Sequence, residues 1–516
     1  MNSEEFRQFG KRSVDYVADY LDNIRDRPVL AEVKPGYLHK LLPKEMPTTP
    51  DHWTQILPDV ENLIMPGITH WHSPKFNAFY PTGSSYPSII GEMLSAAIGC
   101  IGFNWMASPA CTELEVIVLD WLAKALGLPE CYLNTSDGPG GGIIQGSASE
   151  ATLVALLVAK EKTVDYVKEF HPEKREADIK GRLVAYASDQ SNSSVEKSSL
   201  HASITIRLLP ADENGSLRGS TLVEAIDKDI KEGLIPCCVI ATLGSTGTCA
   251  FDRLDELGVI CNEKNIWLHV DAAYAGSACI CPEYRQMLNG IQYADSFDIN
   301  PHKWLLVNFD CSTMWFKDTT PLISAFSVDR IYLKHDHEKQ NNLAPDFRHW
   351  QIPLGRRFRA LKLWFTLRLY GLSGLQSHIR NQCSLAQYFE TLVRNDALFE
   401  IVRPATLGLV CFRAKGEDSF SIQLLDRLNK DGNLYMVAAH VDGKYVLRYC
   451  VCSRLTEPND VESSWALITK TARHLLKENE KAAKGVLFLG GESVSEKKSK
   501  TICTKDEHVK TEIVSN

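Results

Sequence analysis

The sequence predicts an α/β protein built on a mostly parallel sheet, followed by a smaller α+β domain. Between residues 86 and 380, helical patterns alternate with short apolar runs, of which 182–186 and 237–241 are typical of buried strands. Strands that alternate with helices favour a parallel sheet covered by helices on its faces. We therefore assign 86–380 to a large domain and expect its ligand site at the carboxyl ends of the strands.

The segments on either side of this domain differ in composition. Residues 1–85 begin with an amphipathic helical pattern that would suit packing against a second subunit, and its apolar face comprises Phe6, Val14, Val17, Tyr20 and Leu21. Residues 381–483, with strand-like runs at 408–412 and 445–449, are the predicted small domain. Residues 484–516 are rich in Lys, Glu, Ser and Thr, which predicts a disordered tail without a part in catalysis.

The overall composition favours a cytosolic enzyme over a nucleic-acid or membrane protein. The 516 residues carry a net charge of −8 and no basic cluster, so a polyanion partner is not expected. The chain begins without a basic stretch followed by an apolar one, and no apolar run reaches the length of a membrane span. The fifteen cysteines are scattered without a C-x-x-C pair, which predicts buried reduced thiols and no metal site.

Lys303 is the first candidate for chemistry. It follows the polar residues Asn300 and His302 and directly precedes the apolar run 304–307. Partial desolvation lowers the pKa of an ammonium group, so more of it is the free amine that condenses with an aldehyde. Most lysines are solvated surface charges, however, and Lys303 alone would be a weak candidate.

Asp271 strengthens that candidate. It follows the apolar run 266–270, which predicts a buried strand, and so lies where open α/β sheets bind ligands. Aspartate after a strand is also a common turn or N-cap residue, and this fragment alone favours that role. Together, however, Lys303 and Asp271 match the needs of pyridoxal 5′-phosphate (PLP). Its aldehyde condenses with a lysine, and its ring nitrogen must be kept protonated for the ring to act as an electron sink.

The segment 138–152 supplies a candidate phosphate site. Its glycines would let backbone approach a ligand, and Ser147, Ala148 and Ser149 would open a helix whose free N–H groups face the phosphate. Neither the Walker loop nor the G-x-G-x-x-G spacing of dinucleotide sites is met. A glycine-rich segment alone is more often a flexible turn. The order of glycine-rich segment, aspartate and lysine is more specific than any one of them.

With these motifs, the sequence resembles the group II PLP decarboxylases, in particular the aromatic L-amino acid decarboxylase family. The resemblance extends from Met1 to about residue 480, and its densest segments are 70–74, 108–115, 300–304 and 349–359. It implies the aspartate-aminotransferase fold, known as fold type I, with PLP as the cofactor. It also implies a homodimer in which Phe103 and the loop around Tyr332 act across the subunit interface.

The family pattern implies a role for each matching residue. Lys303 would hold the cofactor covalently, Asp271 would pair with its ring nitrogen, Ala273 would pack against the ring and Thr246 would orient it. The whole cofactor-binding set comprises Ser147, Ala148, Ser149, Thr246, Asp271, Ala273, Asn300, His302 and Lys303. The implied substrate pocket comprises Trp71, Tyr80, Pro81, Thr82, Ile101, Phe103 and Asn192. For the apolar residues of this pocket, an ordinary place in the core is the simpler interpretation.

Asn192 departs from the amine-forming pattern, in which a histidine stacks on the cofactor ring. Histidine exchanges a proton near neutral pH, whereas asparagine does not titrate. If the substrate carbon is protonated slowly after carbon dioxide leaves, dioxygen can oxidise it, and hydrolysis then gives an aldehyde, ammonia and hydrogen peroxide. Here the chain resembles the insect aromatic acetaldehyde synthases, which convert dopa to 3,4-dihydroxyphenylacetaldehyde. That resemblance suggests aldehyde chemistry used in cuticle cross-linking.

Tyr332 leaves undecided whether the product is an aldehyde or an amine. It lies in the polar stretch 328–340, which predicts a mobile loop. The decarboxylases use a tyrosine here as a proton donor, while other aldehyde-forming members have phenylalanine. Tyr332 therefore argues for some amine formation, or it closes the loop over the substrate and excludes water. Three hypotheses follow: an aldehyde synthase, an amine-forming decarboxylase, and a scaffold that only holds the cofactor. The intact catalytic set disfavours the scaffold and comprises Lys303, Asn192, Tyr332, Asp271 and Thr246.

Overall fold

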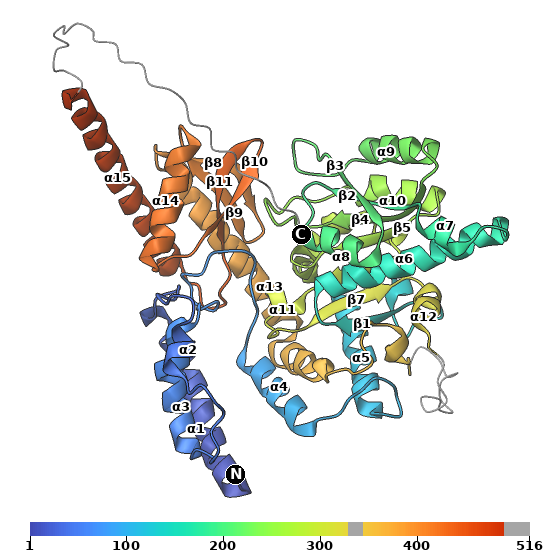
Figure 1. Cartoon of the computed structure of the whole chain (residues 1–516), viewed down its shortest axis with the longest axis horizontal. Coiled ribbons are helices and arrows are strands. Elements are labelled where there is room, and N and C mark those ends of the chain that lie inside the picture. The colour runs from blue at the N-terminus through green and yellow to red at the C-terminus, as the bar shows by residue number, and fades with distance from the viewer. Residues whose placement is uncertain (329–343, 490–516) are drawn as a thin grey trace, which may run out of the picture. The chain divides into compact units, whose positions relative to one another are not determined.

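The large sheet is mostly parallel, as predicted (Figure 1). The structure is a computed structural model that describes residues 1–328 and 344–489. Seven strands form the sheet in the order β1-β7-β6-β5-β4-β2-β3. Strands β6, β5, β4, β2 and β3 are parallel, and β7 is antiparallel to both β6 and β1. Their bounds are β1 Gly141–Gln145, β2 Leu183–Ser188, β3 Thr205–Leu209, β4 Ile235–Thr242, β5 Trp267–Asp271, β6 Ser296–Ile299 and β7 Ser312–Phe316.

Helices connect these strands and pack on both faces of the sheet. The two faces follow the alternation of side chains along each strand. In β5, Trp267 packs in one apolar layer with residues of α6 and α8, whereas Leu268 and Val270 pack in the other with residues of α9 and α10. The helices are α4 Tyr86–Ile98, α5 Pro109–Leu126, α6 Ala148–Phe170, α7 Glu176–Lys180, α8 Ser193–Ala202, α9 Gly219–Lys231, α10 Leu254–Glu263, α11 Pro301–Trp304 and α12 Thr320–Phe326.

The smaller sheet is antiparallel and has the strand order β10-β11-β9-β8. Its strands are β8 Phe399–Thr406, β9 Leu409–Ala414, β10 Val437–Val441 and β11 Lys444–Cys450, with the helices α13 Arg359–Arg394 and α14 Asp418–Asp431. The predicted domain limit at 380/381 falls within α13. Helical geometry in α13 is interrupted earlier, at Gly371, where φ is +63°.

The N-terminal segment contains α1 Ser3–Asp22, α2 Tyr37–Leu41 and α3 Trp53–Asp59. Asn2 and Glu5 form a capping box at the start of α1, which explains why the helix begins there. Within α1 only Leu21 is buried. At the other end of the chain, α15 Pro458–Leu489 continues past Lys484, where the predicted tail begins, and its residues from Thr469 onward belong to a second compact unit.

The predicted approach of the glycine-rich backbone to a ligand does not apply to Gly141 and Gly142, because both belong to the buried strand β1. A Cβ atom on Gly142 would lie 2.6 Å from the Trp315 ring, and one on Gly141 would lie 2.9 Å from the Trp350 ring. These glycines are therefore needed for close packing of β1 against tryptophans. Neither glycine lines the cavity beside Lys303, so only the helix start after β1 remains as the predicted phosphate site.

Candidate active site

A cavity of about 210 Å³ lies at the carboxyl ends of the parallel strands. Thr242 and Asp271 are the last residues of β4 and β5, and Asn300 follows β6. Parallel strands end at one edge of a sheet, so residues far apart in sequence meet there. The predicted residues that line this cavity are Tyr80, Ser147, Ala148, Ser149, Asn192, Thr246, Asp271, Ala273, Asn300, His302 and Lys303.

The remaining predicted residues that the structure describes do not line the cavity in the single chain. Trp71 packs instead beside Phe76 and Phe79, with ring centroids 4.4 and 5.5 Å away. The others are Pro81, which is buried, Thr82 and Phe103, which are partly exposed, and Ile101, which is exposed. Tyr332 lies outside the described residues.

Lys303 is placed on the short helix α11, whose backbone N–H at Lys303 donates to the Asn300 carbonyl at 2.8 Å. The Lys303 side chain is half-buried, and protein atoms surround its amine closely. Burial lowers the pKa of Lys303, and the charges of Asp271 and Asp298 oppose that shift. Nζ lies 5.9 Å from the ring centroid of Tyr80. The amine is thus held in a low-dielectric site that favours its nucleophilic, neutral form.

Two neighbours of Lys303 have fixed orientations. Asp271 accepts a hydrogen bond from the backbone N–H of Ala273 at 3.0 Å, which orients its carboxylate. His302 Nδ1 accepts from the backbone N–H of Cys311 at 2.9 Å, so the ring proton of neutral His302 is on Nε2. Burial, with help from the Lys303 charge, lowers the pKa of His302 to about 3. His302 is therefore a neutral hydrogen-bond donor at physiological pH.

The start of α6 forms the anion-binding side of the cavity. Ser147 is the N-cap, and its hydroxyl oxygen accepts from the Glu150 N–H at 3.2 Å. The first N–H groups of a helix have no partner within the helix and carry the positive end of its dipole. Two other lining atoms, Asn300 Oδ1 and Thr242 Oγ1, are buried and have no hydrogen-bond partner among the described residues. Buried polar atoms of this kind suit a polar ligand.

Asn192 is the N-cap of α8, so it has a structural role as well as a place at the cavity. Its Oδ1 accepts from the Ser194 N–H at 2.9 Å, and its Nδ2 donates to Thr246 Oγ1 at 2.9 Å. Both ends of the amide are engaged, and its orientation is thereby fixed.

Four further lining residues were missed by sequence reasoning: Ser194, Thr242, Gly244 and Tyr274. Tyr274 stacks on Tyr80, with ring centroids 3.8 Å apart. Gly244 has φ +88°, and a Cβ there would lie 2.6 Å from the Ala275 Cβ. A glycine three residues after the predicted strand 237–241 was the signal that could have identified this position.

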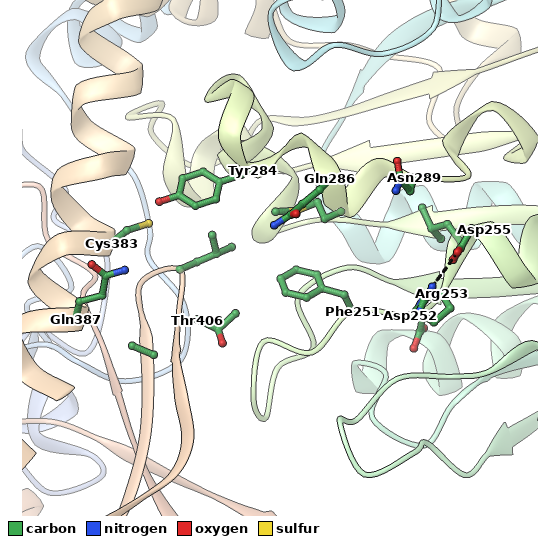
Figure 2. Close-up of a pocket in the computed structure, with 14 residues that line it drawn as sticks. Phe251, Asp252, Arg253, Asp255, Tyr284, Gln286, Asn289, Cys383, Gln387 and Thr406 are labelled. Carbon is green, nitrogen blue, oxygen red and sulfur yellow. Dashed lines mark hydrogen bonds and ion pairs between the residues drawn. The ribbon is translucent and has the colours of Figure 1, made fainter. Parts of the chain in front are cut away.

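A second and larger cavity, of about 480 Å³, lies elsewhere in the chain (Figure 2). Tyr284, Cys383 and Thr406 are among its lining side chains, and Arg253 is paired there with Asp255 at 2.8 Å. It contains no lysine and none of the residues predicted for the site. The chemistry is therefore expected in the smaller cavity.

The donor set of the smaller cavity fits PLP. A partly enclosed lysine, a carboxylate at a strand end and a helix start meet around one space, on a sheet of fold type I. Comparison with known proteins places the chain in the same class: residues 35–415 match the pyridoxal-dependent decarboxylase conserved domain, and the chain belongs to this family. It is a PLP-dependent enzyme of the decarboxylase family.

Individual relatives are similar over most of the chain. An aromatic-L-amino-acid decarboxylase from Manduca sexta is 55% identical over 92% of this chain and 93% of its own length. A 3,4-dihydroxyphenylacetaldehyde synthase from Drosophila melanogaster is 53% identical over 94% and 95%. The crystal structure of Oryza sativa TDC with PLP and tryptamine is 38% identical, with a TM-score of 0.88 over 92% of this chain and 99% of that one. No helix among the described residues is long and apolar enough to cross a membrane.

Proposed function

We propose that the chain is an aromatic acetaldehyde synthase. L-Dopa, dioxygen and water would give 3,4-dihydroxyphenylacetaldehyde, carbon dioxide, ammonia and hydrogen peroxide. The observation that carries the proposal is Asn192, an amide at the cavity that is bonded at both ends and cannot titrate. Slow protonation of the substrate carbon would leave it open to oxidation by dioxygen.

Other described side chains at the cavity are poor substitutes for a titrating histidine. Burial raises the pKa of Tyr80 and of Tyr274 well above the usual value. The Tyr80 hydroxyl donates to the Ser245 carbonyl at 2.7 Å, and the Tyr274 hydroxyl accepts from the Gly408 N–H at 3.1 Å. His302 is neutral with one nitrogen already bonded. These constraints support slow proton delivery.

The residues of the cavity would divide the work of binding. PLP, when bound, supplies the electron sink that lets carbon dioxide leave. Lys303 would hold it covalently, and Asp271 would keep its ring nitrogen protonated. Ala273, a small residue, would lie against the ring, and Thr246 would orient it. The phosphate would be bound by Ser147, Ala148, Ser149, Asn300 and His302.

Aromatic substrates are proposed from the relatives and from the aromatic pair Tyr80 and Tyr274. Each relative named above is described as acting on aromatic compounds or bound to one. Both tyrosines line the cavity, and the Tyr80 ring, whose centroid lies 5.9 Å from the Lys303 amine, adds apolar surface to its wall. Trp71, Pro81, Thr82, Ile101 and Phe103 remain proposed members of the substrate pocket.

An amine-forming decarboxylase is the second candidate. Tyr332 favours it, because that tyrosine is retained where other aldehyde-forming members have phenylalanine. In that case dopamine or a related amine would be the main product, and Asn192 would be a tolerated change.

The product balance separates the two candidates. Purified protein is given L-dopa under air, and carbon dioxide, hydrogen peroxide, aldehyde and dopamine are followed in one reaction. For the synthase, peroxide and aldehyde match carbon dioxide and little dopamine forms. Dopamine equal to carbon dioxide, without peroxide, would establish the decarboxylase.

Variants at position 192 test the reason for the product. Asn192→His is expected to raise the ratio of amine to aldehyde, because it restores a titrating ring. Asn192→Ser is the matched control, since serine also caps helices but does not titrate. The serine variant should keep the wild-type ratio. An unchanged ratio in the histidine variant would contradict this account of protonation.

We also propose a homodimer in the cytoplasm. Large apolar side chains are exposed on α1 and α4, which is unusual for a monomer, and they include Phe6, Val14, Met93, Leu94 and Ile98. A second copy would cover them and bring Phe103 and the loop around Tyr332 to its neighbour's site. The mass of one chain is 57.7 kDa, and light scattering should give twice that value. A fully active monomer would contradict the dimer. Fractionation of cells tests the location.

A further inference from the structure

A buried polar row lies behind the cavity, on the face of the large sheet that α6 covers. Trp267, His269 and Asp271 lie on β5, and Ser296 and Asp298 lie on β6. The two parallel strands are in register, so His269 lies beside Ser296 and Asp271 beside Asp298. No side chain in the row has more than 5% of its surface exposed. Asp271, which lines the cavity, is thus one end of a connected polar structure.

The hydrogen bonds of this row set the position of its protons. Trp267 Nε1, which can only donate, donates to Ser296 Oγ at 2.9 Å. Ser296 Oγ also lies 2.9 Å from His269 Nδ1. Because its oxygen accepts from the indole, Ser296 has its own O–H to give to Nδ1. In that arrangement an N–H of His269 lies at Nε2, which faces Asp298.

Asp298 is poorly compensated for a fully buried carboxylate. His269 Nε2 lies 3.3 Å from Oδ1, but neither carboxylate oxygen has a well-directed hydrogen bond among the described residues. The charged or titratable groups that face it are His269, Asp271 and Lys303. Helix α6 buries only alanine, valine, leucine and threonine, and β7 places Met314 beside Asp298, so neither brings a charge. A buried carboxylate without good hydrogen bonds destabilises the folded protein. The presence of Asp298 here therefore favours a role in function.

We propose that Asp298, held by His269, is a positioning residue whose negative charge reinforces that of Asp271 and helps to keep the cofactor's ring nitrogen protonated. The inference rests on the proposed role of Asp271. A unit charge one layer of side chains away, in an effective dielectric of about 20, changes the affinity of a site for a proton by on the order of tenfold. Both carboxylates also favour the charged form of Lys303.

The test compares two cofactors on the protein freed of its own. One is PLP, and the other is its 1-deaza analogue, in which carbon replaces the ring nitrogen. For each, the dissociation constant is measured with wild type and with Asp298→Asn. The preference for PLP over the analogue should fall on the order of tenfold in the variant, because only PLP has a ring nitrogen to protonate. If Asp298 had only a structural role, both affinities would fall together and the preference would stay, which would overturn the inference.

Three further variants keep the result interpretable. Ser296→Ala removes the hydroxyl that directs the His269 proton and should lower the preference less, and it serves as the test if Asp298→Asn does not fold. Asp229→Asn, at a buried carboxylate bonded to Tyr186, is the matched control and should leave the preference unchanged. Asp271→Asn should lose the preference. If it does not, the proposed role of Asp271 is wrong; if it does while Asp298→Asn and Ser296→Ala keep it, only the present inference is wrong.

Discussion

Asp298→Asn is expected to stabilise the protein without cofactor at neutral pH. Burial, together with the Asp271 charge, raises the pKa of Asp298 to about 6 from 3.8. A raised pKa means that the folded state binds the proton more tightly than the unfolded state. Ionisation of Asp298 therefore removes stability as the pH rises from about 4 to about 6, and the deficit is complete above that range.

The size of the effect follows from the shift. A rise of roughly two in the pKa of Asp298 corresponds to about 3 kcal/mol of stability. This is an upper value, because asparagine loses the contact with His269 and adds an amide that needs hydrogen-bond partners. We expect a gain of about 1 to 2 kcal/mol in the free energy of unfolding at pH 7.5. The gain should shrink toward pH 4, where Asp298 is protonated in both states.

Urea denaturation of the cofactor-free protein measures this gain. Wild type and Asp298→Asn are compared at one protein concentration in buffers from pH 4.5 to 8. Asp120→Asn is the control, because Asp120 is buried but accepts hydrogen bonds from Asn134 and Thr135 and should only lose stability. A difference between wild type and Asp298→Asn that is independent of pH, or that favours wild type at pH 7.5, would refute the reasoning.

Three other substitutions have clear expected outcomes. Lys303→Ala should abolish the absorption band of the bound cofactor at roughly 420 nm, and a band that persists would refute the assignment of the nucleophile. Glu115→Gln should lower the free energy of unfolding by about 3 to 5 kcal/mol in urea titrations, because it leaves the buried Arg356 guanidinium without its carboxylate partner. Gly244→Ala should weaken cofactor binding in equilibrium titrations, since its φ of +88° and the nearby Ala275 leave no room for Cβ.

Much of the fold could be predicted because its strands are short and apolar. The runs 182–186, 237–241 and 266–270 lie within or beside β2, β4 and β5. The glycines of β1 could not be assigned correctly. A glycine in a sequence indicates a flexible backbone, but it does not show that Trp315 and Trp350 pack against that position in the fold. Glycine at a tight packing position and glycine in a loop look alike in sequence.

The site was partly predictable for a different reason. Lys303 and Asp271 are informative as single residues, since an amine and a carboxylate beside apolar runs require an explanation. Ser194 and Thr242 are ordinary polar residues whose place at the cavity arises only when strand ends meet. Asp298 was not recognised either, because its importance depends on the register of β6 with β5.

Asn192 has a place both at the start of a helix and at the cavity, so the residue that we propose to set the product also caps α8. Asparagine is among the best residues for starting a helix, and here it does so for α8 while facing the cavity. Under the proposed function, exchanging a ring for an amide at this point would change proton delivery while keeping a residue that caps the helix well. Natural selection could therefore alter the product by a single codon, with no compensating change elsewhere in the fold.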